Sequence, residues 1–318
     1  MKPTIFKDWK ARASQVGHLL TSLTTKEDLD NYKKRKSELL YEKENLQNAN
    51  GRKVSWTDNK QKELDKLESY ISNPNPLPKG AITHLDDIFR SEFWGRRRIL
   101  YNKYLEKGIM QENDALELLG HVDRTEYFKN EEELVNDWVR GVPDNRQDDK
   151  IRDTKANYDF DSFDRAESDS LYEWQIKTYC WLDGKTEGEL CYCLVNTPRH
   201  RLEAEVKSTW YAMGMPSEDN EEWIETQKQI ERNMIFDPIR YQEDYPDYKF
   251  LNPREELIVP AIFRVKKFKV KLEDGDIEAM KQRIELGREY LINKELEAMR
   301  LIQEYANGLD VHFNESDY

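Results

Sequence analysis

Two aspartates and a lysine lie close enough in one short stretch to form a single chemical site. The stretch "GVPDNRQDDKIRDTK" contains Asp144, Asp153 and Lys155. On a β-strand, Asp153 and Lys155 would point to one face and Thr154 to the other, and antiparallel pairing with the preceding strand would bring Asp144 beside Asp153. Paired carboxylates need a positive partner. A hard divalent cation, which takes oxygen ligands, would supply it, with Lys155 holding a water or a phosphate oxygen.

Polar side chains also fall on helix faces that should be apolar. Glu112 shares a helical stripe with Ala115 and Leu119, and a carboxylate on such a face needs a partner. Gln175 and Tyr179 are four residues apart and therefore share one face of a later helix. These spacings predict that all three polar groups reach into one site.

Hydrophobic periodicity and turn signals predict the elements that position these residues. We expect a mixed α/β core, in the order helix, strand, strand, helix, strand, over residues 99–120 (with a break at Gly108), 133–142, 150–156, 168–183 and 189–198. Upstream, two helices within 25–72 predict a hairpin whose apolar stripe is too thin for a core. Downstream, we expect a long helix over 276–308.

These elements group into four expected segments. They are an N-terminal segment (1–22), an inserted helical hairpin (23–79), the α/β core (80–200) and a C-terminal strand and helix region that completes the domain (201–318).

The composition limits the partners and the compartment. A net charge of -13 argues against nucleic acid only mildly, because a metal site needs acids and DNA contacts can lie in local basic patches. One such patch, "GRRR", makes Arg96 and Arg97 candidate DNA contacts. No apolar run is long enough for a membrane span, no secretory signal is visible, and three cysteines fit a reducing cytoplasm.

The motifs, taken in order, resemble the PD-(D/E)XK nuclease superfamily. Pro143-Asp144 is followed by the Asp-Thr-Lys triplet at 153–155, with Glu112 upstream and a Gln-x-x-x-Tyr motif at 175–179 downstream. This set is similar to that of the RecB-like exonucleases, which include the YqaJ-type viral recombinases and the phage lambda exonuclease branch. The resemblance covers residues 99–198. It implies a restriction-endonuclease-like core, a mixed central sheet flanked by helices, with an inserted helical hairpin and a helical C-terminal region.

The resemblance also implies a role for each motif residue. Glu112, Asp144, Asp153 and the Thr154 carbonyl would bind Mg²⁺, for which Mn²⁺ could substitute. Lys155 would position or deprotonate the attacking water, or stabilise charge on the phosphate.

Further roles that the resemblance implies concern the DNA strand. Gln175 and Tyr179 would orient the active site and the strand, and Arg12 and Ser14 would hold its terminal phosphate.

The implied function is a Mg²⁺-dependent deoxyribonuclease. It would degrade double-stranded DNA from its ends, 5′ to 3′, in phage or prophage recombination, in the bacterial cytoplasm, with a single-strand annealing protein as partner and a homo-oligomeric assembly as one option. The alternatives are a structure-specific or nicking endonuclease on the same core, and a catalytically weak DNA-end-binding scaffold. For Asp144, Asp153 and Lys155 alone, the remaining alternative is a solvated hairpin with a surface ion pair.

Overall fold

The chain forms two compact units, and each is discontinuous in sequence. The computed structural model describes residues 5–21, 23–24, 26–48, 50–73, 76–99, 102–147 and 149–308. The first unit comprises Met1–Trp9, His18–Arg97 and Ile277–Tyr318, and the second comprises Lys10–Gly17 and Arg98–Asp276. The four segments expected from the sequence cut across these units, because 80–97 groups with the hairpin and 10–17 with the α/β core.

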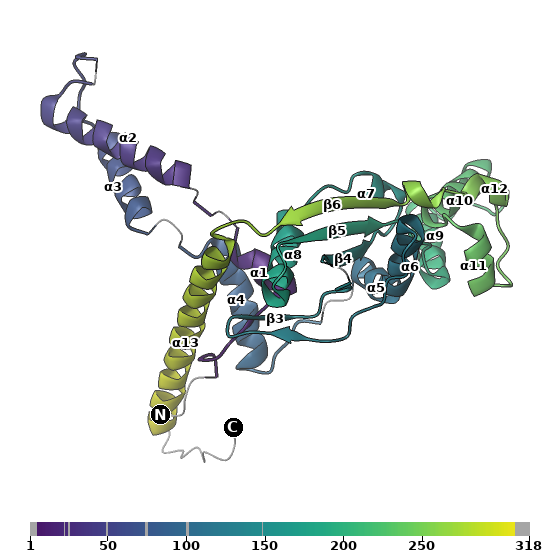
Figure 1. Cartoon of the computed structure of the whole chain (residues 1–318). Coiled ribbons are helices and arrows are strands. Elements are labelled where there is room, and N and C mark those ends of the chain that lie inside the picture. Colours follow the sequence, from purple (N-terminus) through teal and green to yellow (C-terminus); the bar gives the residue numbers. More distant parts are fainter. Residues whose placement is uncertain are drawn as a thin grey trace. The chain divides into compact units, whose positions relative to one another are not determined.

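The expected helical hairpin is part of the first unit. It consists of α2 (Lys26–Asn45) and α3 (Asp58–Ser72), drawn as a helix pair in Figure 1. Its buried core is three leucines, Leu39, Leu64 and Leu67, with partly buried aromatic rings against them. The helices are also joined by ion pairs such as Lys60 Nζ to Glu42 Oε2 at 2.7 Å. The thin apolar stripe therefore packs inside the hairpin itself.

The other long helices of the first unit are α4 (Lys79–Glu92) and α13 (Asp276–Gly308). A Cβ placed on Gly287 of α13 would lie 3.4 Å from Leu85 of α4, so the two helices approach closely there. Tyr290 of α13 donates a 2.7 Å hydrogen bond to Asp86 of α4, and Lys294 pairs with the same carboxylate. The helix expected over 276–308 is confirmed.

The second unit contains two three-stranded sheets. In one, β4 (Ile151–Ala156) runs parallel to β5 (Glu187–Cys193), which pairs antiparallel with β6 (Val265–Lys271). In the other, β3 (Val139–Gly141) lies between β1 (Ala11–Arg12), which is parallel to it, and β2 (Leu134–Val135), which is antiparallel. The segment expected as one strand over 133–142 is therefore two short strands.

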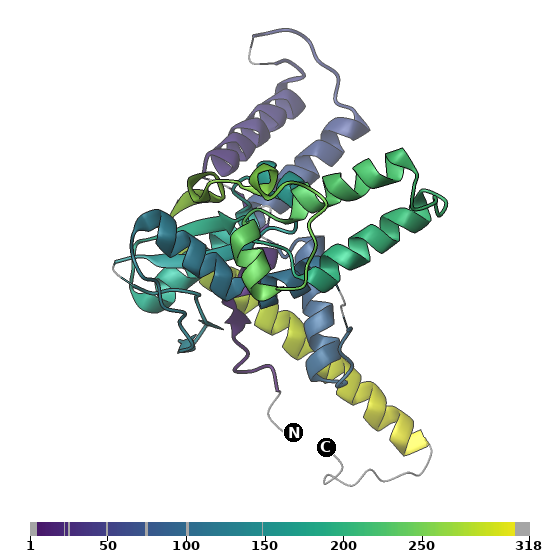
Figure 2. The same cartoon turned by 90° about the vertical axis from the view of Figure 1, so that its right-hand side faces the viewer.

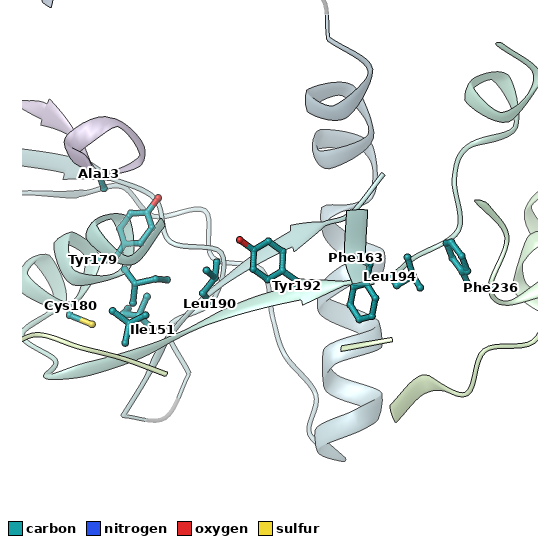
Figure 3. Packing of buried hydrophobic residues seen from close by; sticks show 11 residues of the cluster. Ala13, Ile151, Phe163, Tyr179, Cys180, Leu190, Tyr192, Leu194 and Phe236 are labelled. Atoms are coloured by element: carbon teal, nitrogen blue, oxygen red, sulfur yellow. The ribbon is translucent and has the colours of Figure 1, made fainter. Parts of the chain in front are cut away.

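Alternate residues of β5 face opposite helices. Leu190 and Tyr192 pack in the cluster that contains Ile176 and Tyr179 of α8 (Ser170–Asp183), shown in Figure 3. Cys191 and Cys193 pack instead against α6 (Glu112–Asp123). All three cysteines are buried and free, as core positions should be. The sheet is thus covered by a helix on each face, and these two helices carry the polar residues expected at the site.

The helix expected over 99–120 is divided at a different residue. It forms α5 (Lys103–Met110) and α6, and the break is at Gln111, whose φ of -109° and ψ of 12° leave the helical range. Gly108 stays inside α5 because a glycine within a helix costs only about 1 kcal/mol relative to alanine. The expected stop at Gly120 is also wrong, because α6 continues to Asp123 and is capped by Arg124 in a left-handed conformation.

Seven further helical segments complete the described part of the chain. They are α1 (Ala13–Leu19), α7 (Phe160–Asp164), α9 (Arg199–Ala212), α10 (Glu221–Met234), α11 (Pro238–Asp244), α12 (Arg254–Leu257) and the 3-10 turn η1 (Ala261–Phe263). Figure 2 shows α9 and α10 lying side by side. Among the described residues, no helix combines the length and apolar character that a membrane crossing requires.

Candidate active site

Asp144 and Asp153 are carried by neighbouring backbone segments. Asn145 and Arg152 form an antiparallel bridge with both backbone hydrogen bonds, at 3.1 and 3.0 Å, which places the two aspartates opposite each other. Asp144 Oδ2 accepts hydrogen bonds from the Thr154 amide at 2.7 Å and the Thr154 hydroxyl at 2.9 Å. The N–H and C=O of a strand residue point to the same strand edge, so the Thr154 carbonyl also faces the Asp144 side.

Asp153 links this edge to α8. Its Oδ1 accepts a 2.9 Å hydrogen bond from Gln175 Nε2, which also donates to the Tyr179 hydroxyl at 3.2 Å. Its Oδ2 forms an ion pair with Lys155 Nζ, on the same strand face, as alternation requires. Five of the residues proposed from sequence therefore meet in one connected group: Asp144, Asp153, Lys155, Gln175 and Tyr179.

Burial and neighbouring charges shift the pKa values of Asp144 and Lys155. Burial, and then the nearby charge of Asp153, raises the pKa of Asp144 to about 7. Burial alone would lower the pKa of Lys155, but the charges of Asp153 and Asp144 outweigh it and raise that pKa above its ordinary value. Lys155 therefore keeps its proton and acts in this group as a hydrogen-bond donor and a fixed positive charge.

Glu112 is ion-paired with a lysine in the structure. It is the first residue of α6 and is partly exposed, and its Oε2 lies 3.0 Å from Lys129 Nζ. The partner that we expected to be a shared metal is thus a lysine. Among the described residues, no three His, Cys, Asp or Glu side chains are arranged to hold a metal ion. The structure brings Asp144 and Asp153 together, and Glu112, although paired with Lys129, is near enough for its charge to raise the pKa of Asp144. Its role as a metal ligand stays a prediction.

The remaining donors fit a magnesium ion. Asp153 Oδ2 is buried and has no well-aligned hydrogen bond, although Lys155 is paired with it. Asp144, Asp153 and the Thr154 carbonyl offer only oxygen ligands. Mg²⁺ commonly binds through one or two carboxylates and keeps several waters, so this donor set is sufficient without Glu112.

A pocket of about 290 Å³ adjoins the group. It is lined by Arg12, Ser14, Arg140 and Tyr179, among others, so both predicted phosphate contacts share it with a site residue. Sequence reasoning missed Arg140. It lies opposite Arg12 in the parallel pairing of β1 with β3, and this pairing of distant segments has no local sequence signal.

The other two predicted DNA contacts are elsewhere in the chain. Arg96 and Arg97 are exposed residues of the first unit, whereas the site residues belong to the second. Arg97 Nε donates to Ser91 Oγ at 3.3 Å. Their role in DNA binding stays a prediction.

Comparisons with known proteins identify the fold. No protein-family model matches the chain, and neither does any curated protein. A solved phage-related exonuclease from Haemophilus somnus 129PT is similar in structure, with a TM-score of 0.54 and 16% identity over 92% of this chain and 97% of that one. The alkaline exonuclease LHK-Exo from Laribacter hongkongensis gives a TM-score of 0.47 at 8% identity, over 93% of this chain and 95% of that one.

The complex of LHK-Exo with dAMP gives 0.46 at 9% identity, over 93% of this chain and 95% of that one. The expected α/β fold is confirmed, and it is the fold of a phage-related exonuclease.

Proposed function

We propose that this chain is a metal-dependent DNA exonuclease that hydrolyses phosphodiester bonds at the ends of double-stranded DNA. One observation carries the proposal: Asp144, held by Thr154, lies opposite Asp153, which accepts a hydrogen bond from Gln175 and is ion-paired with Lys155. The phage-related exonuclease fold supports the same reading. Two carboxylates and an ammonium on a single edge suit cation binding and phosphate chemistry better than a solvated hairpin, since Asp153 is only 1% exposed.

Each residue has a specific task in this proposal. Asp144 and Asp153 hold Mg²⁺, and hydrogen bonds from Thr154 and Gln175 fix their orientation. When bound, the ion would lower the pKa of a bound water and neutralise charge on the phosphate. Lys155, which keeps its proton, donates to the water or to a phosphate oxygen. The Tyr179 hydroxyl holds the Gln175 amide in place.

The finer assignments derive from the sequence resemblance. We propose 5′-to-3′ digestion of double-stranded ends, with the terminal phosphate held by Arg12 and Ser14. We also propose a role in phage or prophage recombination in the host cytoplasm, with a single-strand annealing protein as partner.

Digestion of linear and covalently closed circular DNA tests this function. The wild type should release nucleotides from linear duplex in Mg²⁺ or Mn²⁺ and not in EDTA, and it should leave closed circles intact. Asp153→Ala and Lys155→Ala should each reduce the rate by about 100-fold or more, because both remove groups at the reacting phosphate. Asp149→Ala is the matched control in the same loop and should keep wild-type activity.

Two outcomes would count against the proposal. Equal cutting of circles and linear DNA would favour the endonuclease alternative. An inactive wild type that still binds DNA ends would favour the scaffold.

A further inference from the structure

Residues 128–130 are fixed by hydrogen bonds to the segment around Asp144 and Asn145, here called the catalytic loop. They nevertheless present an exposed aromatic ring, that of Phe128. The Phe128 amide donates to Gln147 Oε1 at 2.5 Å, and the Phe128 carbonyl accepts from Asn145 Nδ2 at 3.0 Å. Asn145 is fully buried and adjoins Asp144 in sequence. The Phe128 side chain is nevertheless 60% exposed. Its backbone is therefore fixed relative to the candidate active site, while its ring is open to solvent.

Lys129, the next residue, also has a fixed partner and an exposed side chain. Its Nζ lies 3.0 Å from Glu112 Oε2, and its side chain remains 40% exposed. The next residue, Asn130, donates from its amide to the Asp144 carbonyl at 2.8 Å and from Nδ2 to the Pro143 carbonyl at 3.0 Å. Hydrogen bonds of Phe128 and Asn130 thus hold the backbone on either side of Lys129 against the segment that contains Asp144.

A groove of about 590 Å³ runs between α6 and this segment. Its lining includes Arg124, Tyr127, Phe128 and Lys129. The lining places two aromatic rings beside the cations Arg124 and Lys129, along with the acids Glu117 and Glu126. Aromatic rings beside positive charges bind single-stranded nucleic acid through base stacking and phosphate contacts. A single exposed phenylalanine is ordinary on a protein surface. This one differs because its backbone is held against the catalytic loop and a cation follows it directly.

We propose that Phe128 stacks on an unpaired nucleobase of the strand being degraded and that Lys129 contacts a phosphate of that strand. The inference rests on the proposed nuclease function and names the part of the substrate that this groove takes. Lys129 exchanges its ion pair with Glu112 for the phosphate when the strand binds. Phe128 is a positioning residue, because it holds the base beside the scissile phosphate without touching the reacting atoms.

Binding of a fluorescent DNA end tests the stacking. The probe is a duplex with a short single-stranded end that carries 2-aminopurine, and a Lys155→Ala background prevents digestion. Binding to this parent should quench the fluorescence, because stacking quenches 2-aminopurine. Phe128→Ala should remove the quenching and weaken binding by about 5- to 150-fold, the range for losing one base–aromatic stack. Phe128→Trp should restore both.

The salt dependence separates the two residues. Lys129→Gln should reduce the slope of log K against log salt by about 0.7, the contribution of one phosphate contact on a single strand, while Phe128→Ala should leave that slope unchanged. Phe263→Ala is the matched control, because Phe263 is 69% exposed in the same unit and does not line this groove. It should bind and quench as the parent does.

The stacking role of Phe128 and the nuclease activity can fail independently. If the wild type digests DNA but Phe128→Ala binds and quenches like the parent, the stacking role is refuted and the nuclease remains. If the quenching depends on Phe128 but the wild type digests no DNA, the groove binds a nucleobase and the nuclease proposal fails.

Discussion

Asp144 has a carboxylate that the folded protein makes costly to ionise. Its pKa is raised to about 7 by burial and by Asp153, against about 3.9 in an unfolded chain. Between these two values the folded state keeps a proton that the unfolded state has released, so stability falls as pH rises through this window. Above about pH 7 the full cost is present, unless a bound cation offsets it.

Asp144→Asn should therefore stabilise the metal-free protein at pH 8. The amide oxygen that this substitution introduces can still accept both hydrogen bonds from Thr154, while the charge facing Asp153 is gone. We expect a gain of about 1–3 kcal/mol after allowance for partial solvent screening. Thermal unfolding in EDTA from pH 4 to 8 measures it. The gain should shrink toward pH 4, and a variant less stable than wild type at pH 8 would contradict the assignment.

The candidate site divides into residues that local spacing reveals and residues that it does not. Asp153 and Lys155 alternate on one strand, and Gln175 and Tyr179 share one helix face, so periodicity alone predicted that each pair acts together. Lys129 and Arg140 were missed because their partners lie far away along the chain. The Lys129 partner is Glu112, on α6, and only the folded structure shows that contact.

The helix α5 turns one charged side chain, Lys107, inward. Lys107 is fully buried, and its Nζ donates to the Tyr158 carbonyl at 3.0 Å and to the Val195 carbonyl and Thr197 Oγ1 at 2.9 Å each. Its apolar residues are exposed instead: Tyr104, Leu105, Ile109 and Met110. Hydrogen bonds, rather than an apolar stripe, thus attach the helix to the segments that follow β4 and β5.

Lys107→Met should destabilise the protein strongly. Methionine fills a similar volume but removes the hydrogen bonds to the Val195 carbonyl and Thr197 Oγ1, while the Tyr158 carbonyl keeps only the one from the Thr197 hydroxyl. The loss should cost about 2 kcal/mol or more in free energy of unfolding. Urea denaturation measures the change. Lys103→Met is the matched control on the same helix, because its ion pair with Glu205 is 37% and 32% exposed and should contribute less than about 1 kcal/mol. Equal losses of stability in the two variants would refute the view that the buried hydrogen bonds of Lys107 hold α5 in place.

Gly141, at the end of β3, is required by a close approach. A Cβ there would lie 2.7 Å from both the Ala13 Cβ and the Tyr179 ring. Gly141→Ala should cost about 1–3 kcal/mol and reduce DNA digestion, because the Tyr179 ring that adjoins Gln175 must move. Gly108→Ala, with no atom within 4 Å, should instead stabilise α5 by about 0.5–1 kcal/mol. Denaturation and digestion assays on both variants make the comparison.

Periodicity predicted most elements because each element carries its own apolar stripe. The two sheets follow less directly. The pairing of β1 with β3 joins residues 11–12 to 139–140, and no local pattern in either segment specifies it. The sequence predicted the helix break at Gly108 and not at Gln111. The position of α5 depends on the hydrogen bonds of Lys107 to segments far away along the chain, which the local pattern does not show.

The hairpin and the candidate site belong to different units of the chain. Helices α2 and α3 have their own core in the first unit, and the candidate site residues belong to the second. Replacing residues 26–72 by a short glycine–serine linker should keep the rate of DNA digestion within about threefold of wild type, because a surface excursion with its own core tolerates removal. Digestion assays and circular dichroism check activity and the loss of helix. A much larger loss of activity would assign the hairpin a part in substrate handling.

The discontinuity of the second unit sets the order of its assembly during synthesis. Residues 10–17 leave the ribosome early, but β3, which pairs with β1, appears only after the whole of 18–97 has been made. The edge strand β6 follows later still, at 265–271. Pairing between segments so far apart in sequence is slow to form. The second unit should therefore complete its fold near the end of translation, when β6 becomes available to pair with β5.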